Sequence, residues 1–437
     1  MKIAVLGEGV TGKAVVAKIK DLPGFEIVPL YQHAAAELRQ ARRLEPERAE
    51  FSSLNEHVRA KSNNASRNST TACQADLIVA SPGIPQEQLP ETDTEIISEI
   101  EFAYRLFQEN KNPPRIIAVT GTNGKTTVTS LLAHILEIPY AGNIGVPLIS
   151  FVNQKIAKNA IVVEVSSYQL ELCKLFKPDI AIWLNQTPDH LDRHKTMEEY
   201  SRVKSKVFQN FDKSNTLIYL ETDPIIKRIV DQSSSPFKRL PLNLANPLIN
   251  KFKNMQLIGD HNKLNALASY LAALEFGLTE EEIIEKINSF KAVEHRIEFV
   301  LNCDGREFYN DSKGTNPDST EIAVKAFTKP INLIICGKDK HLPLELFIKF
   351  LHQNVKTITI FGEITERFKK VSQLINPDYQ LFEVGNIRAA LEMSYSLAAK
   401  DEIILFSPSC SSFDQFVNFE QRGRIFKELV QELYGKS

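Results

Sequence analysis

Glycine, lysine and threonine side chains in one short stretch have the spacing of a phosphate-binding loop. Gly121-Thr-Asn-Gly-Lys-Thr-Thr127 follows the apolar run Ile116 to Val119 and precedes a stretch with helical apolar spacing. In such a loop, backbone N–H groups and the helix N-terminus face the phosphates, while Lys125 contacts the outer phosphates and Thr126 binds Mg²⁺. The strict pattern has glycine where this chain has Val119. A tight turn with a surface lysine is therefore the alternative.

Acidic and histidine side chains follow two further apolar runs and are candidate metal ligands. Glu164 is the one acid in its run, where a lone carboxylate is costly unless it meets a cation or hydrogen-bond donors. A Mg²⁺ site beside a nucleotide accounts for it, and a structural ion pair is the alternative. The run Ile180 to Leu184 leads into a loop in which Asp189 and Asp192 flank His190. This spacing makes His190 the candidate for a second metal position.

A second glycine-rich turn lies near the N-terminus. Gly7-Glu-Gly-Val-Thr-Gly12 follows the expected strand Lys2 to Leu6 and precedes a helical stretch that reaches Lys20, as in dinucleotide-binding domains. The next expected strand, Phe25 to Leu30, should then end at an acidic residue, but Tyr31-Gln32 follows it. An NAD oxidoreductase is therefore the alternative, and we expect another phosphate-bearing ligand.

Two polar turns at expected strand ends are candidate ligand contacts. Ser81-Pro-Gly83 follows the buried run Asp76 to Ala80, where open α/β sheets bind ligands. Asn143, within Ala141 to Gly145, has an amide that suits a sugar or a carboxylate. Plain turns are the alternative at both places. Residues 33–75, which include a charged, helical piece and a Ser/Asn/Thr-rich run at 62–71, are given no function.

The C-terminal part also places polar residues at expected strand ends. Asp311 and Lys313, in the loop after Phe308-Tyr-Asn310, offer a hydroxyl acceptor and a cation for phosphate. The helix that follows is capped near Ser319. Cationic and hydroxyl side chains after the later strands suit a small anionic substrate.

Length and the alternation of expected strands and helices indicate an α/β protein of three domains. At roughly 100 to 200 residues per domain, 437 residues allow two to four domains. We expect a Rossmann-like domain over residues 1–112, a central P-loop ATPase domain with a mostly parallel sheet over 113–298, and a second Rossmann-like domain over 299–437. We expect one helix from Thr94 to Gln108, and the linker Lys111 to Pro114 then separates the first two domains.

Composition excludes several classes of protein. The net charge of -2 gives no basic surface for nucleic acid or for an anionic membrane, so we expect no partner of either kind. Five scattered cysteines without Cys-x-x-Cys spacing indicate neither disulfides nor a zinc site. The N-terminus leaves no room for a signal peptide, and no apolar run approaches the roughly 18 residues of a membrane helix. We expect a cytoplasmic monomer, in which the glycosylation motifs at Asn64 and Asn68 are irrelevant.

Motifs in all three expected domains together resemble those of the Mur ligase superfamily, ATP-dependent amide-forming enzymes of bacterial cell-wall synthesis. The most specific are the phosphate loop and Ser407 to Gly423. Within the superfamily the chain is similar to the members that add D-glutamate. The motifs that carry the resemblance are residues 121–127, 164–171, 188–194, 259–262, 295–298, 310–316 and 407–423.

The resemblance implies a mechanism and the roles of the three domains. The first domain binds a UDP-sugar, the central one ATP and the third D-glutamate. ATP phosphorylates the terminal carboxylate of UDP-MurNAc-L-Ala, and the D-glutamate amine attacks the acyl phosphate through a tetrahedral intermediate. Lys125, Mg²⁺ and the helix N-terminus would offset the repulsion between carboxylate and triphosphate. Another amino-acid-adding Mur ligase, a folate polyglutamylating enzyme and a non-catalytic nucleotide-dependent regulator are the alternatives.

The resemblance also implies the metal ligands and the catalytic group. Lys204 lies four residues after Tyr200, as the family's carbamylated lysine does, although a solvated lysine is the ordinary interpretation of such a helix. Lys206 is the alternative if the register differs by two. The implied metal contacts are Thr126, Glu164, His190 and Lys204. The implied catalytic residues are Lys125, Glu164, His190 and Lys204.

The remaining implied contacts fall into three groups. For ATP they are Gly121, Thr122, Asn123, Gly124, Lys125, Thr126, Thr127, Asn265, Arg296, Asp311 and Lys313. For the UDP-sugar they are Thr11, Gly12, Ser81, Pro82, Gly83 and Asn143, and for D-glutamate Thr315, Lys340, Ser412 and Phe419. The chain departs from the family at Tyr31-Gln32, where an acidic residue usually contacts the uridine end, so nothing is carried over there or in residues 33–75.

Overall fold

The computed structural model describes residues 1–28, 75–252, 255, 257–291, 294–375 and 379–435. Helices and strands alternate along these residues and form three mostly parallel sheets, so the predicted α/β class is confirmed. The expectations for Tyr31-Gln32, for the cysteine at position 73, and for residues 33–74 including Asn64 and Asn68, lie outside the described residues. The described chain forms two compact units, which are treated separately below.

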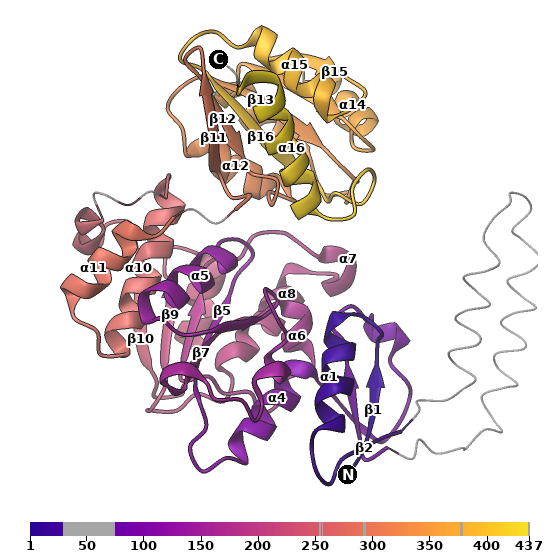
Figure 1. The fold of residues 1–437 in the computed structure, drawn as a ribbon, viewed down its shortest axis with the longest axis vertical. Helices are drawn as coiled ribbons and strands as arrows, with labels where there is room; N and C mark the ends of the chain where they lie inside the picture. The colour runs from indigo at the N-terminus through magenta and orange to yellow at the C-terminus, as the bar shows by residue number, and fades with distance from the viewer. Residues whose placement is uncertain (29–74, 253–254, 256, 292–293, 376–378, 436–437) are drawn as a thin grey trace, which may run out of the picture. The chain divides into compact units, whose positions relative to one another are not determined.

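Unit 1 comprises Met1–Pro114, Ala141–Lys155 and Ser166–Phe176. Its sheet has the order β2-β1-β3-β4, and every neighbouring pair is parallel. The strands are β1 (Lys2–Leu6), β2 (Glu26–Ile27), β3 (Leu77–Ala80) and β4 (Glu95–Ser98), and the helices are α1 (Val10–Lys20), α4 (Glu99–Gln108) and α6 (Ser167–Glu171) (Figure 1). Two stretches that follow the phosphate loop in sequence thus pack with the N-terminal residues.

The sequence-based expectation of one helix from Thr94 to Gln108 is wrong at its start. Residues Glu95–Ser98 form β4, which pairs in parallel with β3, and the helix begins only at Glu99. The β-branched pair Ile96-Ile97 suits a strand beside β3. Ser98 then ends the strand and caps the helix, because its hydroxyl accepts a hydrogen bond from the Glu101 N–H.

Unit 2 comprises Arg115–Tyr140, Ile156–Val165 and Lys177–Ser437, and it contains the other two sheets. The first has the order β10-β9-β8-β5-β7-β6. Its strands are β5 (Arg115–Thr120), β6 (Tyr140–Gly142), β7 (Ala160–Glu164), β8 (Ile180–Trp183), β9 (Thr216–Leu220) and β10 (Lys238–Leu242). Its helices are α5 (Lys125–Leu136), α7 (Leu191–His194), α8 (Met197–Ser205), α9 (Pro224–Gln232), α10 (Asp260–Glu275) and α11 (Glu280–Ser289).

The strand order of this sheet determines where a ligand can bind. β5 pairs in parallel with β7 on one side and with β8 on the other, and both of these strands come after β5 in the chain. The order therefore reverses at β5, and open α/β sheets bind ligands beside the carboxyl ends of the strands at such a reversal. The phosphate loop, Glu164 and the Asp/His loop all lie at the carboxyl ends of these three strands.

The last sheet of unit 2 has the order β11-β12-β16-β13-β14-β15, with only the β11–β12 pair antiparallel. Its strands are β11 (Glu298–Cys303), β12 (Arg306–Asn310), β13 (Ile331–Cys336), β14 (Thr357–Phe361), β15 (Gln380–Glu383) and β16 (Ile403–Ser409). Its helices are α12 (Pro317–Lys325), α13 (Glu345–Asn354), α14 (Thr365–Ile375), α15 (Ile387–Leu397) and α16 (Phe419–Tyr434).

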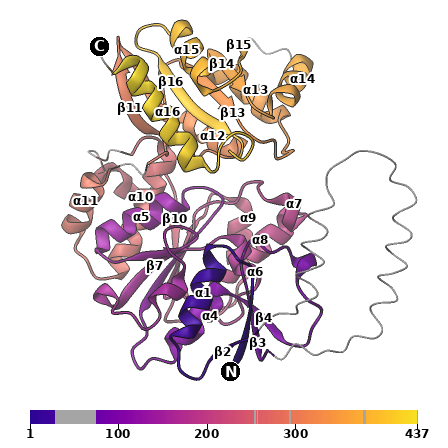
Figure 2. The same ribbon diagram turned by 45° about the vertical axis from the view of Figure 1, so that its right-hand side comes forward.

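Helices cover both faces of this last sheet, as its continuous apolar strands require. Leu333 and Ile335 of β13 pack in the core that contains α12, α13 and α14. Ile334 points the opposite way, into the core with α15 and α16, which Figure 2 shows over one face of the sheet. Successive side chains of a strand alternate between faces, so a parallel sheet buried on both sides is apolar throughout.

The predicted boundaries at residues 112 and 298 stay a prediction. The three sheets fall one in each predicted range apart from Glu298, the first residue of β11, whereas the compact units number two. A separate finding concerns membranes: within the described ranges, no helix is long and apolar enough to cross a bilayer.

The glycines of the turn between β1 and α1 differ in how closely the backbone surrounds them. A Cβ atom on Gly12 would lie 1.9 Å from the carbonyl oxygen of Gly7, whereas a Cβ on Gly9 would meet nothing within 4 Å. Gly9 also has an ordinary φ of -73°. The helix can therefore start close to the strand only if residue 12 has no side chain.

Gly12→Ala should lower the free energy of unfolding by about 1–3 kcal/mol, because the backbone must move to admit the methyl group. Chemical denaturation of the full chain would measure this, with Gly9→Ala as the matched control. Equal stability of both variants would contradict the close approach.

Candidate active site

The phosphate loop connects β5 to α5, and two of its glycines cannot be replaced without strain. Gly121 has φ +149° and Gly124 has φ +85°, values that favour glycine. A Cβ on Gly124 would also lie 2.7 Å from the Asn265 side-chain oxygen. The backbone of the loop is thus free to approach a ligand, and α5 begins directly after it, at Lys125.

Two lysines donate to the same backbone oxygen of this loop. Lys125 Nζ lies 2.8 Å from Gly121 O and 2.9 Å from Thr122 O. Lys204 Nζ, from α8, lies 2.8 Å from Gly121 O. Burial lowers the pKa of both ammonium groups, and the Lys125 charge lowers that of Lys204 further. Lys204 is 1% exposed, so the interpretation as a solvated lysine is wrong.

Strand register places the candidate metal ligand Glu164 beside the loop. Val119 of β5 is paired with Glu164, the last residue of β7, and both are buried. On the other side of β5, Asn185 after β8 is joined to Asn123 by two hydrogen bonds, 2.8 Å from the Asn123 N–H to Asn185 Oδ1 and 3.0 Å from Asn185 Nδ2 to Asn123 O. Three strand ends therefore meet at the loop, as their order in the sheet predicts.

His190 lies at the end of the loop after β8 with a left-handed φ of 54°. Its Nε2 atom is 3.5 Å from the carboxylate of Asp189. Burial lowers the pKa of His190 to about 4, which keeps the imidazole neutral, the form that binds metals. Asp189 also accepts a hydrogen bond of 3.1 Å from Asn316 and lies 3.6 Å from Lys340 Nζ.

Two cations from the C-terminal part of unit 2 reach the hydroxyl of Thr126. Lys313 Nζ donates to Thr126 Oγ1 at 2.8 Å, and Arg296 donates to the same oxygen at 3.3 Å. Burial, together with the Arg296 charge, lowers the pKa of Lys313 to about 7. A polyanion beside these groups would offset both effects, so the arrangement favours phosphate binding.

A cavity of ≈ 220 Å³ adjoins the loop. Both apolar and polar side chains line it. Its size and lining suit a flat ring with hydrogen-bonding edges, such as a nucleobase. The polar lining comprises Asn123, Asn185, His261, Asn262, Asn265, Arg296, Asp311 and Ser319. The apolar lining includes Leu184, Leu220, Leu257, Leu264, Ile297 and Ile322. Sequence reasoning missed these apolar residues, because nothing in their spacing separates them from core residues; His261 lies in a motif that the resemblance used.

Asp311 is held in the cavity wall by two hydrogen bonds. The Ser407 hydroxyl donates to it at 2.7 Å and the Ile297 N–H at 3.3 Å. Burial raises the pKa of Asp311 to about 7. This acid can therefore accept a proton or a hydroxyl hydrogen bond near neutral pH.

The residues expected to bind D-glutamate lie around the loops after β12, β13 and β16. Phe419 is at the start of α16. Lys313 Nζ lies over the Phe419 ring, 4.9 Å from the ring centre. Ser412 is buried and Thr315 is half-buried. Sequence reasoning missed Arg422, which is fully buried and donates to Ser312 O and Cys410 O at 2.7 and 3.1 Å. Arg422 could have been found from the sequence, because it lies within the motif Ser407 to Gly423 that carries the resemblance.

The residues expected to bind the UDP-sugar all fall in unit 1. A Cβ atom on Gly7 would lie 2.6 Å from the Ser81 hydroxyl, so the turns after β1 and β3 touch. Thr11 and Gly12 lie in the first turn of α1, Pro82 and Gly83 follow Ser81, and Asn143 follows β6 in the segment Ala141–Lys155. The structure therefore brings Asn143 into the same unit as N-terminal residues distant in sequence.

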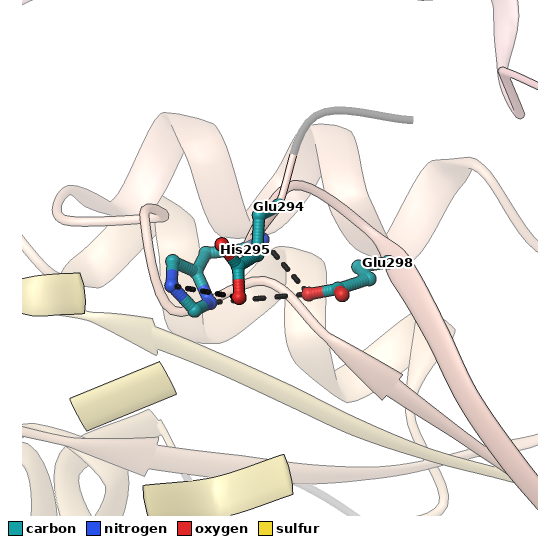
Figure 3. A group of neighbouring side chains, drawn as sticks. All are labelled: Glu294, His295 and Glu298. Carbon is teal, nitrogen blue, oxygen red and sulfur yellow. Dashed lines mark hydrogen bonds and ion pairs between the residues drawn. The ribbon is translucent and has the colours of Figure 1, made fainter. Parts of the chain in front are cut away.

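One acidic group with metal-like spacing in the described chain is already paired with a lysine. Glu294, His295 and Glu298 lie together in Figure 3. Lys427 pairs with both carboxylates, at 2.5 Å from Glu294 and 2.9 Å from Glu298. His295 Nδ1 lies 2.9 Å from Asn310 Nδ2, so that ring nitrogen accepts a hydrogen bond. These contacts hold the chain on both sides of Arg296, and the ion pairs with Lys427 give the group a structural role.

The first turn of α12 is hydrogen-bonded to Asn123 of the phosphate loop. Asn123 Nδ2 and the Thr187 hydroxyl both donate to Asp318 Oδ2, the latter at 2.9 Å. The Ser319 hydroxyl donates to Asn123 Oδ1 at 2.9 Å. Burial raises the pKa of Asp318, whereas these donors lower it. Within unit 2, Asp318 thus connects α12 to the ends of β5 and β8.

Comparison with known proteins gives concordant matches. Residues 119–240 match the Mur ligase middle domain, and residues 295–410 match the Mur ligase glutamate ligase domain. UDP-N-acetylmuramoylalanine--D-glutamate ligase of Caldanaerobacter subterraneus subsp. tengcongensis is 38% identical over 384 residues, which cover 82% of this chain and 84% of that protein. The enzyme of the same name from Caldicellulosiruptor bescii is 38% identical over 392 residues, with the same coverage.

Solved structures share the fold at low sequence identity. The MurF ligase of Thermotoga maritima in complex with ADP has a TM-score of 0.59 at 16% identity, covering 86% of this chain and 92% of that one. A pseudomurein peptide ligase type C from Methanothermus fervidus has a TM-score of 0.58 at 16% identity and covers 99% of both chains.

Asp318→Ala should lower the free energy of unfolding by about 1–3 kcal/mol, because two half-buried donors, Asn123 and Thr187, lose their shared acceptor. Denaturant titration of the full chain measures the change. Lys325→Ala, in the same helix but paired with Glu321 at the surface, is the control and should change stability by less than about 1 kcal/mol. If Asp318→Ala lowers the free energy of unfolding no more than Lys325→Ala does, Asp318 does not stabilise the connection between α12 and the ends of β5 and β8.

Proposed function

The chain belongs to the Mur ligase family, and we propose that it is the ATP-dependent ligase that joins D-glutamate to UDP-N-acetylmuramoyl-L-alanine in peptidoglycan precursor synthesis. Relatives that carry this activity in their names are 38% identical over most of the chain. The observation that carries the proposal is the convergence of Arg296 and Lys313 on Thr126, one residue from Lys125. These cations surround the place where a triphosphate and a carboxylate must approach each other.

Charge neutralisation is the first task of the proposed reaction. The substrate carboxylate attacks the γ-phosphorus, a bond forms between carboxylate oxygen and phosphorus, and ADP leaves. Lys125, Arg296 and Lys313 would bind the phosphate oxygens, and the N-terminus of α5 would add its partial positive charge. Because their pKa values are lowered without an anion, these side chains gain most from binding one.

A Mg²⁺ ion fits the residues beside the loop. Glu164 is a buried carboxylate at a strand end, Thr126 offers a hydroxyl and His190 a neutral imidazole. Oxygen ligands of this kind suit Mg²⁺, which would neutralise phosphate charge when bound. Lys204 would contribute as a carbamate, because its lowered pKa favours the neutral amine that adds to CO₂ with loss of a proton.

The second half-reaction uses the C-terminal part of unit 2. The amine nitrogen of D-glutamate attacks the acyl carbon, and inorganic phosphate leaves from the tetrahedral intermediate. Lys340, Thr315 and Ser412 would hold the two carboxylates of D-glutamate, with the N-terminus of α16 at Phe419 as a further source of N–H donors. Asn123, Asn265 and Asp311 would line the adenosine site.

Unit 1 would bind the UDP-sugar. Thr11, Gly12, Ser81 to Gly83 and Asn143 would bind UDP-N-acetylmuramoyl-L-alanine, and their common membership of unit 1 supports this. We expect a cytoplasmic monomer with small-molecule substrates, divided into domains at residues 112 and 298.

Release of ADP or phosphate from the full chain tests this proposal. With ATP, Mg²⁺ and UDP-MurNAc-L-Ala present, D-Glu should support release, whereas L-Glu, L-Lys and meso-diaminopimelate should not. The product should be heavier by one glutamyl residue, and Lys125→Ala should release nothing. Release with another amino acid would overturn the proposed substrate while leaving the family unchanged. Absence of release with any of them would overturn the activity.

Lys204→Ala should reduce this release by a factor of about 10² or more, because a ligand-forming group in the water-excluded site is lost. Added bicarbonate should restore nothing, since alanine cannot form a carbamate. Lys206→Ala is the matched control two residues away and should keep near-wild-type activity. Activity close to wild type in Lys204→Ala would contradict the carbamate role, and loss only in Lys206→Ala would move that role to Lys206.

A further inference from the structure

Three charged side chains of unit 1 are buried against the two stretches that join it from later in the sequence. Lys18, Glu99 and Glu101 are 9%, 1% and 0% exposed. Burying a charge is costly unless hydrogen bonds compensate for it. None of the three belongs to the proposed ligand sites, so their burial requires another explanation.

The carboxylate of Glu101 accepts hydrogen bonds from the backbone of the stretch Ser166–Phe176. The consecutive N–H groups of residues 174–176 all donate to its carboxylate, at 3.1, 2.9 and 2.9 Å in chain order. Arg105 donates to it at 2.8 Å. Ser98, at the start of the same helix, also contacts this stretch: its N–H donates to Leu172 O at 3.4 Å, and its hydroxyl lies 3.3 Å from the Cys173 sulfur. The stretch begins two residues after Glu164, the proposed metal ligand, and contains α6, which lies beside α4.

Glu99 and Lys18 hold the stretch Ala141–Lys155 in the same manner. Glu99 Oε1 accepts the N–H of Ile149 at 2.6 Å, and Lys18 Nζ donates to Val152 O at 2.7 Å. This stretch contains Asn143, six residues before Ile149. Burial raises the pKa of Glu99 to about 7, so glutamine imitates its protonated form closely.

We infer that the two first-turn acids of α4, Glu99 and Glu101, are positioning residues for the UDP-sugar. They fix the stretch that carries Asn143 and the stretch that follows Glu164 onto the unit that binds the nucleotide-sugar. This inference rests on the proposed function. A side chain that accepts several backbone N–H groups at once allows one placement of that backbone, whereas apolar packing tolerates small shifts. The placement of the substrate carboxylate would depend on that precision.

Glu101→Gln tests the inference, because its amide keeps one acceptor oxygen but turns N–H donors toward the three N–H groups. The KM for UDP-MurNAc-L-Ala should rise about tenfold, while the KM values for ATP and D-Glu stay within about twofold. Glu95→Gln is the matched control. Glu95 also pairs with Arg105, but its side chain is 34% exposed. The control should leave all three KM values unchanged.

A second pair of variants keeps the test decisive if Glu101→Gln does not fold. Glu99→Ala should raise the KM for UDP-MurNAc-L-Ala several-fold, and Glu99→Gln should restore it, since the glutamine oxygen can still accept the Ile149 N–H. A parallel rise in all three KM values, or the same effect in Glu95→Gln, would overturn the positioning role.

Calorimetric binding of UDP-MurNAc-L-Ala separates this inference from the proposed function. Binding by the wild type that is weakened in Glu101→Gln and in Glu99→Ala supports both. Equal binding by wild type and variants overturns the positioning role alone. Absence of binding by the wild type overturns the proposed function and the inference with it.

Discussion

The carbonyl oxygen of Gly121 accepts hydrogen bonds from two lysines, and much of unit 2 is arranged to make this possible. Burial lowers the pKa of both Lys125 and Lys204, the Arg296 charge lowers that of Lys125 further, and the Lys125 charge lowers that of Lys204 further. A backbone oxygen compensates only in part, because it carries no full charge. The positive charges of these two ammonium groups are therefore only partly compensated, and an anionic ligand would supply the missing negative charge.

The surrounding elements follow from that requirement. The φ of +149° at Gly121 turns its carbonyl toward the lysines, and only glycine adopts such a φ without strain. β5 must lie between β7 and β8 so that Glu164 and the loop to His190 reach the same edge of the sheet. Arg296 and Lys313 flank the β11–β12 pair of another sheet of unit 2. The Lys313 N–H donates to the carbonyl of His295 at 3.1 Å, and the His295 N–H donates to Glu298 at 2.9 Å, so both cations are joined to the group around Glu298.

Sequence reasoning reached the features that depend on local patterns. The phosphate loop, the strands before it and after it, and the Asp/His loop are each encoded within about a dozen neighbouring residues. It failed where the tertiary environment decides. Ile96-Ile97 form a strand because β3 lies beside them, and Lys204 is buried because its helix covers the loop. The apolar cavity wall at Leu220 and Leu257 also escaped, since a leucine that lines a cavity looks like one in a core.

Glu101 of unit 1 and Lys313 of unit 2 are charged groups whose hydrogen-bond partners differ in kind. In unit 1 the carboxylate of Glu101 is saturated by three backbone N–H groups and Arg105, so it has no capacity left for a ligand and acts on structure. In unit 2 the ammonium group of Lys313 has a neutral hydroxyl as its hydrogen-bond partner at 2.8 Å, which an anion can replace at a gain in free energy. Saturation favours one fixed backbone arrangement, whereas incomplete compensation favours binding. The difference in hydrogen-bond partners therefore distinguishes residues that position a substrate from residues that bind it, even where both kinds are equally buried.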